Sequence, residues 1–402
     1  MIELDSEQKK AITKLRNGSI LCGGVGTGKS LTALVYFLEN VCQGSYSDVT
    51  SEVKTAKDLY IITTAKKRDD LEWEREMIPF MLKDKGIHIS VDSWNNIKKY
   101  EKVKNAFFIF DEQKVVGKGV WAKTFIKIAK NNEWILLTAT PGDTWADYIP
   151  VFIANGFYKN RTEFVRRHIV YNRYTNFPKI DRYLEIPTLQ KNRAKVLVMM
   201  KSRKHTKPHK IFEYCSFSEP RWNQLVKDRW DIYNNKPLLD ASSLCYAMRR
   251  VVNSDFSRYN RLIEVLSKHR KLIVFYNVDY ELDILRDLNN ITNLKVAEHN
   301  GHKHEPLPEG DDWVYLVQYT SGCEAWNCIT SNTIVFYSLN YSYKVMTQAA
   351  GRIDRRDTPY KDLYYYYFVS KSPIDAGIRQ SLSKKKKFNE NSWDYIDSAF
   401  FS

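Results

Sequence analysis

Short apolar runs separated by longer amphipathic stretches dominate the first third of the chain. The runs are GSILCGG, LYIITTA, AFFIFDE and WILLTATP, and the helix-length stretch SLTALVYFLENV follows the first of them. Strands that are apolar on both faces and alternate with helices are typical of a parallel sheet covered on both sides. The pattern therefore predicts an α/β lobe over residues 1–155.

The same alternation returns near the C-terminus. The runs there are KLIVFY, LKVAEH, WVYLVQ, NTIVFYS and LYYYYFVS, and they predict a second α/β lobe over residues 211–402. Within the last run, the tyrosines are expected to alternate between one buried and one exposed face. The predicted fold class is thus α/β, with two parallel-sheet lobes and a helical insert between them.

The middle of the chain has a different pattern. Residues 156–210 are expected to form a basic insert or connector, because KNRAKVLVMMKSRKHTKPHK has many lysines and arginines and no acidic residue. Such a run attracts phosphates, although a solvated loop is nearly as good an interpretation. The segments EPRWNQLVKDRWDIYNN and SRYNRLIEVLSKH predict a helical layer at about 218–270.

Length and charge narrow the possible functions. A chain of 402 residues is too long for one core, which agrees with two lobes. Its 62 Lys and Arg against 47 Asp and Glu give a net charge of +15, which favours an anionic partner, first nucleic acid and second an anionic membrane. No apolar run approaches the roughly 20 residues of a membrane span, and the N-terminus lacks the apolar block of a secretion signal. We therefore expect a protein that is not secreted and has no membrane partner.

The stretch GGVGTGKS, residues 23–30, fits the pattern of a phosphate-binding loop between a strand and a helix. Its glycines allow backbone N–H groups to converge on phosphate oxygens, while Lys29 reaches the β and γ phosphates and Ser30 ligates Mg²⁺. A chance glycine turn is the alternative, and the strand-loop-helix setting disfavours it. The residues predicted to bind the nucleotide here are Gly24, Gly26, Thr27, Gly28, Lys29 and Ser30.

An acidic pair follows another apolar run, in FFIFDEQK. Asp111 and Glu112 stand where a parallel strand ends, which is where ligands collect in open α/β sheets. Asp111 is predicted to hold Mg²⁺, and Glu112 to orient and deprotonate the attacking water. A pair of acidic side chains that simply faces solvent is the alternative. Beside a phosphate-binding loop, the pair predicts a hydrolase.

Two arginines far along the chain have the chemistry to complete such a site. In QAAGRIDRR, Arg352 and Arg355 stand three residues apart and so on one face of a helix or turn. Planar guanidinium groups suit contacts with phosphate oxygens in the transition state. A solvated basic helix end is the alternative interpretation.

In this order, GGVGTGKS, DEQK, LTATP, YTSGCEAWN and QAAGRIDR resemble the motif series of superfamily 2 helicases. Within that superfamily the chain resembles the Swi/Snf-like branch and the small phage-encoded helicases of DEAD/DEAH type. The resemblance spans roughly residues 4–380. It implies two RecA-like lobes, ATP and Mg²⁺ as cofactors, and a nucleic-acid-dependent ATPase.

The resemblance also implies roles for single residues. Gln8 matches the glutamine that reads adenine, and Thr138 and Thr140 fall in the motif that links hydrolysis to lobe movement. Gln348, Arg352 and Arg355 match the residues that the second lobe brings to the γ-phosphate. The residues expected to contact nucleic acid are Thr63, Thr64, Lys66, Ser93, Trp94, Thr320 and Ser321. For each hydroxyl, capping of its own backbone is the alternative.

The leading hypothesis is an ATP-dependent DNA helicase or translocase, acting in phage DNA replication or recombination. Single-stranded or forked DNA is the expected partner, replication or recombination proteins are possible further partners, and a monomer in the cytoplasm of a bacterial host is expected. The alternatives are an RNA helicase or annealing motor, and a nucleotide-gated scaffold that binds nucleic acid with little turnover.

Overall fold

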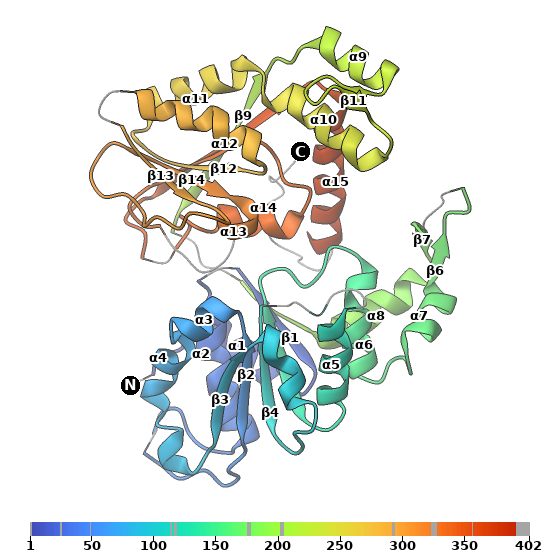
Figure 1. Ribbon diagram of the computed structural model, residues 1–402. Helices are drawn as coiled ribbons and strands as arrows, with labels where there is room; N and C mark the ends of the chain where they lie inside the picture. The colour runs from blue at the N-terminus through green and yellow to red at the C-terminus, as the bar shows by residue number, and fades with distance from the viewer. Residues whose placement is uncertain are drawn as a thin grey trace. The chain divides into compact units, whose positions relative to one another are not determined.

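The structure is a computed structural model, and it describes residues 2–24, 26–48, 50–112, 115, 119–174, 178–201, 205–291, 294–322, 328–355 and 357–390. The chain folds into two compact units, the first of which includes the described residues up to 201 and the second those from 205 to 387. Each unit is built on a six-stranded sheet in which every neighbouring pair is parallel (Figure 1). This confirms the predicted α/β fold class with two parallel-sheet lobes.

The first unit has the strand order β3-β2-β4-β5-β1-β8. The strands are β1 (Ser19–Gly23), β2 (Leu59–Thr63), β3 (Ile89–Ser93), β4 (Phe107–Asp111), β5 (Glu133–Thr138) and β8 (Leu197–Met200). The helices are α1 (Ser6–Lys14), α2 (Lys29–Tyr36), α3 (Ala65–Asp69), α4 (Glu72–Met77), α5 (Val120–Ala129), α6 (Ile149–Ala154), α7 (Arg161–His168) and α8 (Ile186–Val196). Short π or 3₁₀ turns cover Phe37–Val41, Ile78–Phe80, Lys83–Lys85, Trp94–Tyr100 and Trp145–Tyr148, and an antiparallel hairpin joins β6 (Ile169–Tyr171) to β7 (Ile180–Tyr183).

Both faces of this sheet are buried, as the apolar runs predict. Successive residues of β1 point to opposite faces, so that Ile20 belongs to the core under α5 to α8 and Leu21 to the core under α1, α2 and α4. All five residues of β1 and all five of β4 are buried. The carboxyl ends of these parallel strands consequently lie at one edge of the sheet, where Gly23 and Asp111 end their strands.

Residues 156–203 belong to the first unit. They form α7, the β6–β7 hairpin, α8 and β8, and β8 pairs with β1 so that Met200 lies opposite Gly23. The basic run from 191 to 210 therefore spans the end of α8, all of β8 and the start of β9. Its Arg193 is buried, with its guanidinium 4.7 Å from the ring centroid of Trp145. The apolar residues within the run, such as Val196, enter the core and draw the segment into the unit.

The second unit has the strand order β13-β14-β12-β15-β16-β9. The strands are β9 (Lys207–Cys215), β12 (Lys271–Tyr276), β13 (Lys295–His299), β14 (Trp313–Gln318), β15 (Thr333–Phe336) and β16 (Asp362–Ser370), with a small hairpin of β10 (Trp230–Asp231) and β11 (Lys236–Pro237). The helices are α9 (Glu219–Asp228), α10 (Ala241–Asn253), α11 (Phe256–Lys268), α12 (Asp279–Leu285), α13 (Tyr319–Gly322), α14 (Tyr343–Ala350) and α15 (Pro373–Glu390), and a 3₁₀ turn covers Arg286–Asn290.

The helical layer expected at about 218–270 corresponds to α9, α10 and α11, which lie between β9 and β12 in the sequence. Helices α11 and α12 pack on one face of the second sheet, and α14 and α15 pack on the other. The first predicted helix is short, because Arg229 takes a left-handed conformation with φ +54° and ends α9. No described helix in either unit is long and apolar enough to cross a bilayer.

The tyrosines of β16 were expected to have one exposed face, and this expectation was wrong. Tyr365 and Tyr367 belong to one core, and Tyr366 belongs to the core on the other face. The strand lies between β15 and β9 and is covered by helices on both sides. Alternation of similar apolar side chains cannot distinguish a strand buried on both faces from a half-buried one.

Candidate active site

The predicted phosphate-binding loop lies between β1 and α2. Gly26 and Gly28 have φ +77° and +75°, a left-handed conformation that side chains with a Cβ rarely adopt. Gly28 caps the start of α2 without a side-chain bond, so that backbone N–H groups remain at the helix N-terminus. A Cβ on Gly28 would lie 2.4 Å from Nε2 of Gln8, whereas one on Gly26 would meet nothing within 4 Å. The loop therefore has the geometry to bind an anion through its backbone.

The side chain of Lys29 folds back over this loop. Its Nζ donates hydrogen bonds to the carbonyl oxygens of Gly23, at 2.9 Å, and Gly24, at 2.8 Å. Thr27 is buried, and its hydroxyl donates to the carbonyl of Gly24 at 3.0 Å. Removal from water lowers the pKa of Lys29, and the nearby charge of Lys67 acts in the same direction. A phosphate beside this ammonium would compensate for its burial.

Gln8 lies against the loop from α1. Its Oε1 accepts the backbone N–H of Asp5 at 2.8 Å, and the carboxylate of Asp5 caps the same helix in return. The side chain is only 2% exposed, and its Nε2 has no hydrogen-bond acceptor among the described residues. A buried amide donor without an acceptor is costly. It fits a ligand acceptor such as adenine at this position.

The acidic pair lies at the end of β4, two strands from β1. Asp111 is 3% exposed, and its Oδ2 accepts three hydrogen bonds: from Thr63 Oγ1 at 2.9 Å, Lys67 Nζ at 2.9 Å and Trp73 Nε1 at 3.1 Å. Glu112 follows with φ +59°, and its Oε1 lies 3.7 Å from Nζ of the same lysine. The two carboxylates thus share one ammonium group.

Charge and burial oppose one another in this cluster. Burial alone would raise the pKa of Asp111, but the Lys67 ammonium and the hydrogen bonds from Lys67, Thr63 and Trp73 hold that pKa below its ordinary value. Burial likewise works against the ammonium of Lys67, while Asp111 and Glu112 raise its pKa. Asp111 is therefore an anion at neutral pH, which is the form that a divalent cation requires.

The donor set also fits Mg²⁺. Hard cations of this size take oxygen ligands, and in nucleotide sites they are usually held by one or two protein oxygens together with phosphates. Ser30, the second residue of α2, and Asp111 would supply those oxygens, and the charges of Asp111 and Glu112 both act on Lys29. The hydroxyl of Ser30 follows β1 and the carboxylates follow β4, so both lie at the carboxyl edge of the first sheet.

The motif at the end of β5 is buried. The hydroxyl of Thr138 donates to the carbonyl of Thr140 at 3.0 Å and accepts the N–H of Thr140 at the same distance. The Thr140 hydroxyl is buried without a hydrogen-bond partner among the described residues. A tight turn thus follows β5. In the sheet, β5 lies between β1, which precedes the loop, and β4, which precedes the acidic pair.

In the second unit, the residues expected to act on the γ-phosphate lie at the end of α14 and just after it. Gln348 is buried within the helix, which ends at Ala350. Arg352 lies in the turn that follows and is 6% exposed, and Arg355 lies after that turn and is half-buried. That the two arginines share one face stays a prediction.

The residues expected to contact nucleic acid differ in their exposure to solvent. Thr63, Ser93 and Trp94 are at most 2% exposed; the hydroxyl of Thr63 donates to the carboxylate of Asp111, and the indole of Trp94 donates to its backbone carbonyl at 2.9 Å. Thr64 caps α3 by accepting the N–H of Lys67, which is the alternative role considered for it. The side chains that solvent reaches are those of Lys66, Thr320 and Ser321.

Sequence reasoning missed two side chains that define the acidic site. Lys67 lies on α3, four residues after the end of β2, and Trp73 lies on α4. Both bind Asp111, although the sequence separates them from it by about forty positions. Strand order would have predicted these contacts with Asp111. Strands β2 and β4 are parallel neighbours, so residues that follow β2 lie close to the carboxyl end of β4.

No protein-family model and no curated protein matches the chain. Among solved structures, the chain is similar to the SWI2/SNF2 ATPase core of Sulfolobus solfataricus in complex with dsDNA. The sequence identity is 12% and the TM-score 0.43, and the match covers 98% of this chain and 93% of that chain. At this level of similarity, the function of the chain has to be argued from its own residues.

Proposed function

We propose that the protein is an ATPase of the superfamily 2 type that hydrolyses ATP in response to nucleic acid and moves along DNA. One observation carries the proposal: Lys29 on the phosphate loop and the pair Asp111 and Glu112 act on one another electrostatically at one edge of a parallel sheet. A loop that presents backbone N–H groups and an ammonium, opposite a carboxylate pair, has the parts for phosphoryl transfer to water.

The burial and hydrogen bonds of the residues in the first unit suggest a separate role for each. The loop and Lys29 would hold the phosphates, and Ser30 with Asp111 would hold Mg²⁺, whose chemistry is to neutralise charge on the phosphate oxygens. Asp111 is deeply buried and restrained by three donors, which suits a ligand that must not move. Glu112, whose Oε1 lies 3.7 Å from Nζ of Lys67, would accept a proton from water.

We further propose that Gln348, Arg352 and Arg355 of the second unit act on the γ-phosphate during hydrolysis. Guanidinium groups placed on phosphate oxygens stabilise the charge that develops in the transition state. Support comes from their chemistry and from their position at the end of α14 and in the segment after it, which contains the buried Ile353. ATP would thereby couple the two units, and hydrolysis would release them.

DNA is the proposed track. The net charge of +15 lowers the cost of approaching a polyanion, and Lys66, Thr320 and Ser321 remain accessible to phosphates. A role in phage replication or recombination, with DNA that is single-stranded or forked, is proposed on the resemblance of the motifs. The buried side chains of Thr63 and Trp94, which both donate to Asp111, suit support of that carboxylate better than contact with DNA.

Steady-state phosphate release tests the proposal when it is measured with single-stranded DNA, duplex DNA, RNA and no polynucleotide. DNA should accelerate release several-fold above the level without polynucleotide. A strand-displacement assay with 3′-tailed, 5′-tailed, forked and blunt DNA then separates unwinding from movement alone. Stimulation by RNA but not DNA would replace the proposal by an RNA helicase or annealing motor. ATP binding without phosphate release under any condition would replace it by a nucleotide-gated scaffold.

A further inference from the structure

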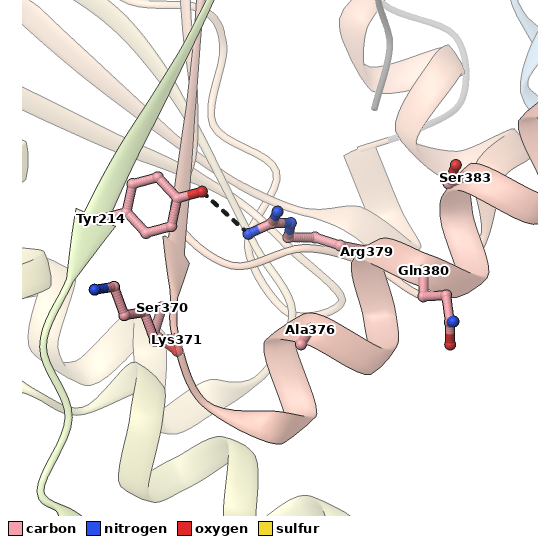
Figure 2. A pocket seen from close by; sticks show the side chains of 7 residues that line it. All are labelled: Tyr214, Ser370, Lys371, Ala376, Arg379, Gln380 and Ser383. Atoms are coloured by element: carbon pink, nitrogen blue, oxygen red, sulfur yellow. Dashed lines mark hydrogen bonds between the residues drawn. The ribbon is translucent and has the colours of Figure 1, made fainter. Parts of the chain in front are cut away.

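A pocket of about 640 Å³ lies on the second unit, away from the motif residues discussed above. It is lined by Tyr214, Ser370, Lys371, Ala376, Arg379, Gln380 and Ser383, which come from the ends of β9 and β16 and from α15 (Figure 2). Because β9 and β16 are parallel, the pocket stands at the carboxyl edge of the sheet, where Ser370 lies opposite Cys215. None of the motifs found in the sequence accounts for it.

The lining combines positive charge with an exposed aromatic ring. Lys371 is exposed and Arg379 is half-buried, and neither has a carboxylate partner among the described residues. The Arg379 guanidinium donates to the hydroxyl of Tyr214 at 3.4 Å and lies 5.9 Å from the centroid of its ring. Tyr214 is 51% exposed, and Figure 2 shows Arg379 reaching from α15 towards its hydroxyl group.

The floor of the pocket is fixed by a buried ion pair. Asp375 Oδ2 accepts from Arg258 at 2.7 Å and from both the N–H and the hydroxyl of Ser370 at 2.8 Å. Arg258 is fully buried and also donates to the carbonyls of Tyr337 and Phe368. This network ties the start of α15 to β16. It also pairs the carboxylate of Asp375 with Arg258, and the charged side chains among the lining residues are Lys371 and Arg379.

We propose that this pocket binds a single-stranded nucleic-acid segment, with Lys371 and Arg379 on phosphates and Tyr214 stacked on a base. Every base presents a face for stacking, and guanidinium groups pair with phosphate oxygens, so an aromatic ring beside two cations suits a strand without sequence preference. The pocket thus adds a nucleic-acid contact at the outer strand of the second sheet. This proposal rests on the proposed function, because both assume that the protein binds nucleic acid. Binding in the pocket, however, requires no ATP.

Equilibrium binding of labelled oligo-dT by the full chain without nucleotide tests the proposal. In the double variant Lys371→Gln/Arg379→Gln, affinity should fall about tenfold or more at low salt, and the slope of log affinity against log salt should shrink by about 1.4, or roughly 0.7 for each lost phosphate contact. Tyr214→Leu should weaken binding roughly fivefold through lost stacking. An oligo-U arm of equal length distinguishes DNA from RNA as the source of the strand.

Two matched substitutions serve as controls. Lys268→Gln removes an exposed lysine just before β12, at the amino edge of the same sheet, and Tyr246→Leu removes a tyrosine that is 45% exposed on α10. Both should bind oligo-dT as the unaltered protein does. Thermal unfolding reports whether each variant folds. If the double variant does not fold, Arg379→Lys together with Lys371→Gln keeps one charge and should give an intermediate loss.

Photocrosslinking of the unaltered protein gives a second readout. An oligonucleotide that carries 5-iodouracil should crosslink to Tyr214, as mapped by mass spectrometry. The pocket proposal is overturned if Tyr214 is not crosslinked and the double variant binds like Lys268→Gln. Loss of poly-glutamate binding in the double variant, with oligo-dT binding intact, would mark an acidic-peptide surface instead. If DNA stimulates ATP hydrolysis but the pocket variants bind oligo-dT like the unaltered protein, the pocket proposal alone is overturned. Pocket-dependent binding without ATP hydrolysis overturns the proposed function alone.

Discussion

The ammonium of Lys67 lies 2.9 Å from the carboxylate of Asp111, at the place where the proposed site needs a cation. The same ammonium is 3.7 Å from Glu112, and Asp111 is almost fully buried. Lys67 therefore neutralises a pair of carboxylates that would otherwise repel each other. In the proposed mechanism, it shares Asp111 with Mg²⁺.

Removing the Lys67 ammonium should destabilise the fold. In Lys67→Met, Asp111 stays buried without its ion partner, and loss of one member of a buried pair costs about 3 kcal/mol. Urea unfolding in EDTA measures this loss, and added Mg²⁺ should restore part of it. The control Lys66→Met changes an exposed neighbour and should alter the free energy of unfolding by less than about 0.5 kcal/mol. Equal losses in the two variants would contradict the role assigned to Lys67.

Low pH should lower the free energy of unfolding because it protonates Asp111. The pKa of Asp111 is lowered in the folded state, so its stabilising effect is present above the unfolded pKa of about 3.9 and is lost as the pH falls through the folded value. Asp111→Asn has no such titration. Between neutral pH and about pH 3, the unaltered protein should therefore lose more free energy of unfolding than the variant. Parallel pH profiles for the two proteins would rule out this contribution.

The two left-handed glycines of the phosphate loop should respond differently to a methyl group. Gly26→Ala and Gly28→Ala both force a Cβ into a left-handed conformation, at a cost of about 1 kcal/mol each. Only Gly28→Ala also displaces Gln8, which the helix cap holds in place. Its extra cost should vanish in the double variant Gln8→Ala/Gly28→Ala. Urea unfolding checks this cycle, and strictly additive effects would contradict the contact.

Replacing an arginine after α14 should slow hydrolysis without weakening ATP binding. We expect Arg355→Lys to reduce turnover on the order of 10³-fold, because lysine does not reproduce a planar guanidinium contact in the transition state. Arg270→Lys, a change at an exposed arginine paired with Asp312, is the matched control and should leave turnover unchanged. Phosphate release and nucleotide binding are measured on both. Normal turnover in Arg355→Lys would remove it from the catalytic set.

The sequence was most informative where backbone requirements restrict residue type. The glycines of the phosphate loop and the long apolar runs predicted β1, β2, β4 and β5, and Asp111 followed from the strand that precedes it. Strands β3 and β9 carry polar or basic residues, whereas β8 is an apolar run of only four residues, and none of the three was predicted. Strand β8 in particular forms by pairing with β1, which is a tertiary contact that local sequence does not encode.

Side-chain direction within the site could not be predicted from the sequence. Thr63 ends β2 and Trp94 follows β3, and the resemblance implied that both contact nucleic acid. Both polar groups instead bind Asp111, one at its backbone carbonyl and one at its carboxylate. Composition does not reveal whether a polar group at a strand end faces solvent or a buried carboxylate.

Phosphate release by the unaltered protein and by Glu112→Gln, with and without single-stranded DNA, tests the central claim most directly. The substitution keeps the shape of the side chain but removes its ability to accept a proton from water. We expect DNA-stimulated release by the unaltered protein, and release reduced by about 10² or more in the variant while ATP still binds. Undiminished release by Glu112→Gln, or release that no polynucleotide accelerates, would contradict the account.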